Sequence, residues 1–303
     1  MIVGMCILLG AMMETGGGFD NIMRYIGTTH PDMLEPFSRG KMPMSLYISQ
    51  WLLVGICTLA LPQSVVRGIS YKNTKALHRA MIIGTIVIGA MTLVATWIGI
   101  LSKGILTEGL VAYGGSVDNI TPTAIIKSMS PFWAGVIIIG PIAATISTVS
   151  SLLLSSSSSI IKDVYMNLKK EKGEVLSNNA VRMYSLAATI ILGFIVYAIA
   201  IDPPSVIWQI NMFAFGGLET AFFWVLIFGL FWPKANKTGA IAAMCGGVIV
   251  YCVTMAMKIK VLDLHQIVLG MVFSLILFLI GNSMGKSADE KTLRTFFPER
   301  YDD

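Results

Sequence analysis

Residues 141–159 read PIAATISTVSSLLLSSSSS, and ten of these nineteen residues are Ser or Thr. No charged residue lies between Lys127 and Lys162, so the stretch belongs to an apolar run that exceeds the roughly 20 residues needed to cross a bilayer. Lipid offers no hydrogen-bond partner, so these hydroxyls must face backbone, other protein, water or an ion. A membrane segment of this composition is the first candidate for a functional site.

The composition of the whole chain indicates an all-α integral membrane protein. Its 303 residues are 55% hydrophobic and only 13% charged, whereas about a quarter of a soluble chain is charged. The charges gather in short clusters between apolar runs of roughly 20 residues. The net charge of +5 is typical of basic loops at a membrane surface, because no segment alternates basic and aromatic residues as a nucleic-acid-binding face does.

The apolar runs predict about eight transmembrane helices. The first, residues 1–13, is short and ends at Glu14 and the glycines 16–18. We expect the chain to begin inside a helix of a longer protein; the alternative, a signal peptide, requires a basic segment and a small-residue cleavage site, and neither is present. The other spans are expected at 45–66, 78–102, 132–161, 179–201, 205–232, 237–257 and 263–283, followed by a tail at 284–303.

The distribution of Lys and Arg predicts the orientation of these spans. With eight crossings, the segments on one side of the membrane hold 15 basic residues and those on the other hold 7. The more basic side faces the cytoplasm in most membrane proteins. We therefore predict a multi-pass protein of the inner (plasma) membrane with both ends of this chain in the cytoplasm.

The residues that usually carry enzyme chemistry do not form a recognisable pattern. The four cysteines lie in apolar spans without metal-ligand spacing, and only three dispersed histidines accompany them. No nucleophile elbow, phosphate loop or dinucleotide fingerprint occurs, and the glycines of MCGGVIV (244–250) suit close helix packing. We predict that the protein is not an enzyme.

Three residues near the middle of the Ser/Thr-rich span suit a cation. Ala144, Ser147 and Thr148 stand at i, i+3 and i+4 and so share one face of a helix. A carbonyl and two hydroxyls would supply about half of the shell of a hard cation such as sodium, and an unwound second helix would supply the rest. The alternative is that these hydroxyls bond back to their own helix; the serines 155–159 favour a packing surface or a wet exit path.

Two other spans are expected to be broken. Pro62 lies inside the 45–66 span and is followed by Gln63, and Gly216-Gly217 is expected to interrupt the 205–232 span close to Glu219. Interrupted spans with polar groups at mid-depth are typical of transporter substrate sites. The alternatives are a simple kink at Pro62 and an interfacial position for Glu219.

Three stretches carry a resemblance to a known family. The stretch ATISTVSSLLLSSSSSIIKDVY (144–165), with Asp163 and Tyr165 near its end, resembles the sodium-site helix of the sodium:solute symporters, and LPQSVVRG (61–68) and GLFWPKANKTGA (229–240) are similar to other parts of that family. Within the family, the sodium/pantothenate symporters are the most similar. The resemblance implies that Ala144, Ser147 and Thr148 bind sodium, and it covers essentially the whole chain.

The resemblance also implies an inverted-repeat fold of five plus five helices in a single membrane domain (1–303). Residues 1–13 would be part of the last helix of the first repeat, 45–232 the second repeat, 237–283 two trailing helices and 284–303 a cytoplasmic tail. The N-terminal helices of the family, which complete its sodium and substrate sites, have no counterpart in this sequence. The implied activity is sodium-coupled import of a small carboxylate, with pantothenate as first choice.

Gln63, Gln209 and Asn211 are the expected substrate contacts, chosen for polarity and position. Three alternatives stay open: a symporter for another solute such as an amino acid, a channel, and a membrane sensor on the same fold. The ion-site residues include no carboxylate or histidine, which favours sodium over a proton as the coupling ion. The sequence predicts no nucleic-acid partner, and it does not predict an oligomeric state.

Overall fold

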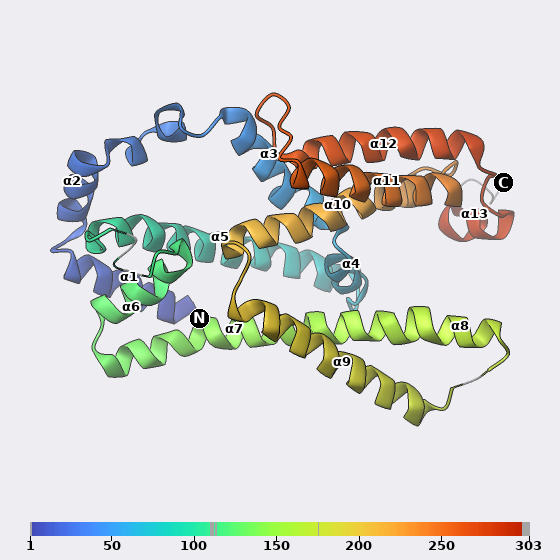
Figure 1. Cartoon of the computed structure of the whole chain (residues 1–303), viewed down its shortest axis with the longest axis horizontal. Helices are drawn as coiled ribbons and strands as arrows, with labels where there is room; N and C mark the ends of the chain where they lie inside the picture. The colour runs from blue at the N-terminus through green and yellow to red at the C-terminus, as the bar shows by residue number, and fades with distance from the viewer. Residues whose placement is uncertain (1, 110–111, 113, 175, 299–303) are drawn as a thin grey trace. The chain divides into compact units, whose positions relative to one another are not determined.

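The computed structural model describes residues 2–298 except 110, 111, 113 and 175, and in these residues it contains helices and no strand (Figure 1). The all-α membrane fold predicted from composition is therefore confirmed. The α-helices are α1 (Ile2–Thr15), α2 (Phe19–Thr29), α3 (Met44–Gly55), α4 (Pro62–Ile69), α5 (Thr74–Ile105), α6 (Ile120–Ser128), α7 (Pro131–Ser158), α8 (Met166–Glu171), α9 (Asn178–Ile201), α10 (Ile207–Phe231), α11 (Lys237–Ala256), α12 (Gln266–Met284) and α13 (Glu290–Phe296).

Short helical turns join several of these helices. The 3₁₀ turns in the described residues are η1 (Pro31–Leu34), η2 (Pro36–Gly40), η3 (Cys57–Ala60) and η5 (Val117–Asn119), and η6 (Ser159–Tyr165) is a π-helix. Among the described helices, α5, the continuous α7–η6–α8, α9, α10, α11 and α12 are each long and apolar enough to cross a membrane. These six helices match the corresponding spans predicted from hydropathy.

The two remaining predicted spans take other forms. Helix α1 is followed, after the glycines 16–18, by α2, and the pair is bent by 71°. Counting this pair as one span raises the number to seven among the described residues. Two helices lie outside the predicted spans: α2 lies between the first and second spans, and α6 lies between the third and fourth.

The chain divides into two compact units. The first unit comprises residues 1–31 and 74–206, and the second comprises residues 32–73 and 207–303.

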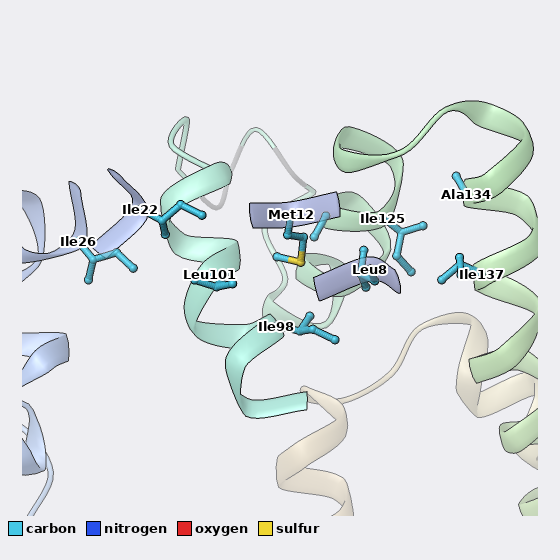
Figure 2. Packing of buried hydrophobic residues seen from close by; sticks show 10 residues of the cluster. Leu8, Met12, Ile22, Ile26, Ile98, Leu101, Ile125, Ala134 and Ile137 are labelled. Atoms are coloured by element: carbon cyan, nitrogen blue, oxygen red, sulfur yellow. The ribbon is translucent and has the colours of Figure 1, made fainter. Parts of the chain in front are cut away.

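The core of the first unit forms around α1. Leu8 and Met12 of α1 belong to one buried cluster with Ile98 of α5 and Ile125 of α6 (Figure 2). The buried members of this cluster are Leu8, Met12, Ile22, Ile26, Ile98, Leu101, Ala124, Ile125, Ala134 and Ile137. All are apolar, so van der Waals packing of these side chains holds the helices together in this cluster.

The bend between α1 and α2 is occupied by one side chain. A Cβ on Gly16 would lie 2.4 Å from Cδ1 of Ile22, and a Cβ on Gly104 of α5 would lie 2.5 Å from Cγ2 of the same residue. Both distances are shorter than side-chain carbons tolerate, so the two glycines are needed for Ile22 to reach its position.

The second unit is built around α10, α11 and α12. Helices α11 and α12 lie side by side in Figure 1, and glycines bring their backbones together. A Cβ on Gly239 would lie 2.9 Å from the carbonyl oxygen of Phe278, and one on Gly247 would lie 2.8 Å from the carbonyl oxygen of Thr220 in α10. The MCGGVIV glycines therefore serve helix packing, as predicted.

The expected break at Gly216-Gly217 is wrong, because α10 runs without interruption from Ile207 to Phe231. The two glycines instead make room for an aromatic ring: a Cβ on Gly216 would lie 2.4 Å from the hydroxyl oxygen of Tyr251. That hydroxyl donates to the carbonyl of Met212 at 3.0 Å. The glycine pair therefore packs against α11 and does not unwind α10.

The 45–66 span is broken, but the break lies earlier than Pro62. Helix α3 ends at Gly55, the 3₁₀ turn η3 follows, and Pro62 begins the separate helix α4. Proline suits the first turn of a helix because its missing N–H has no helical partner there. The residue that predicted a kink therefore starts a new helix.

Candidate functional site

The candidate cation face lies on α7, which continues from Pro131 to Ser158 through Pro141. Ala144 is half-buried, whereas Ser147 and Thr148 are exposed in the first unit. The Thr148 hydroxyl donates to the Ala144 carbonyl at 3.1 Å, so two of the three predicted ligands are neighbours. To accept a cation between them, the Thr148 hydroxyl would turn its proton away and present a lone pair.

The hydroxyls around this face bond to their own helix. Thr145 donates to the carbonyl of Pro141 at 3.0 Å, and Ser151 donates to the carbonyl of Thr148 at 2.9 Å. Such bonds satisfy the hydroxyl proton and leave oxygen lone pairs directed away from the helix. The structure therefore shows back-bonding for Thr145, Thr148 and Ser151, whose hydroxyl oxygens keep acceptor lone pairs.

The serine run at residues 155–159 divides into packed and open positions. Ser157 is fully buried, and its oxygen accepts a hydrogen bond of 2.8 Å from the Thr189 hydroxyl of α9. Ser155, Ser156 and Ser159 are exposed. The packing interpretation is confirmed for Ser157.

Beyond the serines the helix changes its winding. Residues 159–165, which include Asp163 and Tyr165, form the π-helix η6, and the helical span continues to Glu171. The predicted end of this span near residue 161 is therefore ten residues too early. Tyr165 contacts the ring of Tyr184 of α9 edge-on, with centroids 5.6 Å apart, so η6 packs against α9. Single π turns are frequent at functional sites.

The expected substrate residues occupy two helices of the second unit. Gln63 is half-buried in α4, Asn211 is half-buried in α10, and Gln209 is exposed near the start of α10. Because α10 is an intact helix, positions 209 and 211 are two residues apart and point to different faces. The roles of these three residues stay predictions, and the two on α10 do not form one shared surface.

An aromatic cavity that the sequence did not predict lies at Trp208, the residue before Gln209. It has a volume of about 280 Å³ and is lined by Met42, Tyr47, Gln50, Trp51, Val54 and Trp208. Tyr47 and Trp51 meet edge-on with centroids 6.0 Å apart. Aromatic walls with a few polar groups are typical of small-molecule sites. The i, i+3, i+4 spacing of Tyr47, Gln50 and Trp51 was the available signal in the sequence.

Glu219 differs most from its expected environment. Its side chain is 0% exposed and it lies near the middle of α10, far from either helix end, which does not fit the interfacial position considered above. Neither carboxyl oxygen has a hydrogen-bond partner in the described part of the chain. The described residues also contain no group of three or more His, Cys, Asp or Glu side chains that could hold a metal ion.

Comparison with known proteins places the chain in a family of transporters. The family model that matches residues 1–247 describes the sodium:solute symporter family. The chain is 36% identical over 293 residues to the sodium/pantothenate symporter of Haemophilus influenzae, covering 96% of this chain and 59% of the relative. The corresponding symporter of Escherichia coli is 34% identical over 296 residues, which cover 97% of this chain and 60% of the relative.

More distant relatives transport a different solute. The osmoregulated proline transporter OpuE of Bacillus subtilis is 24% identical over 290 residues, which cover 92% of this chain and 56% of the relative. No solved structure gives a significant match. The chain spans about three-fifths of the length of the pantothenate symporters it matches. With most of its length matched by the family model, the chain belongs to the sodium:solute symporter family.

Proposed function

We propose that the protein is a sodium-coupled symporter that imports a small carboxylate, with pantothenate as the first candidate. The observation that carries this proposal is the Ala144, Ser147 and Thr148 face of α7, where a carbonyl and a hydroxyl oxygen lie 3.1 Å apart. Family membership and identities of 34% and 36% to two sodium/pantothenate symporters support it. The protein acts in the plasma membrane, with both ends of this chain on the cytoplasmic side.

Sodium acts in this proposal by selecting one conformation. Binding at the α7 face stabilises the state that accepts solute from outside, and the ion gradient then drives the change to the inward-facing state. An ion with equal affinity for both states would shift neither population. Gln63, Gln209 and Asn211, together with the cavity at Trp208, are the proposed solute contacts in the second unit.

Uptake by the complete protein encoded by the natural gene tests the proposal. Proteoliposomes with an inward sodium gradient are expected to accumulate labelled pantothenate above its outside concentration, and an ionophore that collapses the gradient should abolish accumulation. Equilibration without accumulation would instead identify a channel. Lack of pantothenate uptake under either condition would remove pantothenate as the solute.

The proline transporters among the relatives support a second candidate, a sodium symporter for an amino acid. Excess unlabelled proline added to the same vesicles separates the two. Under the first proposal proline leaves pantothenate uptake unchanged. If labelled proline accumulates and labelled pantothenate does not, the second proposal replaces the first.

A further inference from the structure

Glu219 is a buried acid that the proposed transport mechanism does not use. It lies within the membrane-length helix α10, its side chain is 0% exposed, and both carboxyl oxygens lack a hydrogen-bond partner. A buried ionised carboxylate without a partner carries a large desolvation penalty. Acidic residues kept at such positions usually serve ion or proton movement.

The elements packed around α10 supply no positive charge to Glu219. In the second unit α10 packs against η3, α11 and α12. Cys57 of η3 and Tyr251 of α11 are the titratable groups that interact electrostatically with Glu219. The sequence of α12 contains no titratable residue. No ion pair to Glu219 forms within the described residues.

The other titratable groups of these elements are placed as follows. On α11, Lys237 is its first residue, Cys245 is exposed and Cys252 is half-buried beside Tyr251. His265 caps α12, and Tyr47 of α3 is exposed. The Tyr251 hydroxyl donates a hydrogen bond to the Met212 carbonyl at 3.0 Å, so it does not donate to Glu219.

A second feature that bears on the charge of Glu219 is the C-terminal end of α3. Helix α3 ends at Gly55, and Cys57, which interacts with Glu219, begins the turn that follows. The C-terminal end of a helix carries a partial negative charge on its last carbonyls. The end of α3 therefore supplies no positive charge to α10, which packs against η3.

The surroundings favour a proton over a metal ion. The buried cluster in this region consists of Leu53, Cys57, Met212, Tyr251, Ile267 and Met271. Sodium requires several oxygen ligands, by the same logic that governs other hard cations, and most of this cluster offers hydrocarbon or sulfur. A proton needs neither a coordination shell nor additional space.

We propose that Glu219 is a proton-binding site, separate from the sodium face of α7. The carboxyl holds a proton while α10 packs against the turn between α3 and α4. When this contact opens to water, the O–H bond breaks, the proton passes to water and the carboxylate becomes hydrated. Proton binding at Glu219 therefore favours the arrangement in which α10 packs against η3, the turn between α3 and α4.

Infrared difference spectroscopy of the complete protein in bilayers tests this proposal without relying on transport. The expected result is a carboxylic acid C=O band at neutral pH that is lost in Glu219→Gln and unaffected by sodium. Glu290→Gln is the matched control, because Glu290 is exposed and paired with Arg294 at 2.8 Å, and it should leave the band unchanged.

Three outcomes would overturn the proposal. If Glu219→Gln removes no acid band at neutral pH, the group is ionised; if sodium abolishes the band, the group is a sodium ligand. Should Glu219→Gln fail to fold, Glu219→Asp supplies the second test, because it keeps the acid and should shift the band without removing it. A band that is identical in wild type and Glu219→Asp would also contradict the assignment.

Discussion

The membrane-length helices of the two units are similarly apolar but differ in how much of their surface is buried. In the first unit, the buried share of the most apolar 18-residue stretch is 6% in α5, 6% in α7–α8 and 0% in α9. In the second unit, the corresponding share is 22% in α10, 28% in α11 and 33% in α12. The second unit places glycines at its helix contacts, and the first leaves its Ser/Thr face open. Hydropathy therefore shows which segments enter the membrane, and small residues show which of them pack tightly.

The sharpest way to test this comparison is to add one methyl group to each unit. Gly247→Ala would place a Cβ 2.8 Å from the Thr220 carbonyl oxygen, so we expect a loss of about 1–3 kcal/mol in unfolding free energy. Gly135→Ala on α7 meets open space, and we expect no loss and a gain of up to about 1 kcal/mol. Thermal unfolding in detergent measures both. Equal shifts would show that the packing difference has no energetic meaning.

The open face of α7 should matter for ion binding. In the complete protein, Ser147→Ala or Thr148→Ala removes one oxygen ligand, and we expect the sodium concentration for half-maximal uptake to rise about tenfold, equivalent to about 1.4 kcal/mol. Ser155→Ala, which removes an exposed hydroxyl two turns further along α7, is the control and should leave it unchanged. Unchanged sodium dependence in both site variants would refute the site.

The second unit should also respond to pH through His265. Its buried ring accepts a hydrogen bond from the Ile267 N–H at the start of α12, at 3.3 Å, and its backbone N–H donates to the Ser49 hydroxyl at 2.9 Å. Burial, and secondarily the nearby Lys260 charge, lower the pKa of His265 below its usual value.

Because the unfolded chain binds the proton more readily, this contribution to stability is present above the unfolded pKa of about 6.5 and is lost as pH falls toward the folded pKa. We expect His265→Asn, which keeps a cap, to remove the pH dependence, and His265→Ala to cost about 1 kcal/mol at neutral pH. Unfolding measured across this pH range tests both effects. A wild-type stability that rises on acidification through this window would contradict the sign.

The smallest expected effect lies in the first unit, at the hydroxyl pair between α7 and α9. Thr189→Val and Ser157→Ala each remove the 2.8 Å hydrogen bond. A double-mutant cycle should give a coupling energy of about 0.6 kcal/mol, the usual value for such bonds in membranes. Additive single effects would show that these helices are held together by other contacts.

The sequence predicted the positions of the long helices and the packing role of the glycines at 246 and 247, because both depend on local composition. It did not predict the environment of Gly216 and Glu219. A glycine pair in an apolar helix is equally compatible with a break and with a close neighbour, and only the position of Tyr251 in another helix decides between them. Pro62 shows the same limit, since proline either kinks a helix or begins one.

The candidate site was predicted only in part for a related reason. The i, i+3, i+4 spacing is sufficient to place Ala144, Ser147 and Thr148 on one face, because a helix fixes that geometry. The aromatic cavity at Trp208 brings together residues from α3 and α10, which are distant in sequence. Spacing along α3 places Tyr47, Gln50 and Trp51 on one face, but it does not identify Trp208 of α10 as the residue that meets them.

The glycines between α1 and α2 would usually be regarded as a hinge, yet Ile22 turns this corner into a fixed joint. Its two branches occupy the spaces that two glycines leave open, Gly16 in the corner and Gly104 on α5. Straightening the corner would require withdrawing this side chain from both recesses at once. Helices α1, α2 and α5 are therefore expected to move as one rigid body. Any hinge in this unit is expected outside the α1–α2 corner.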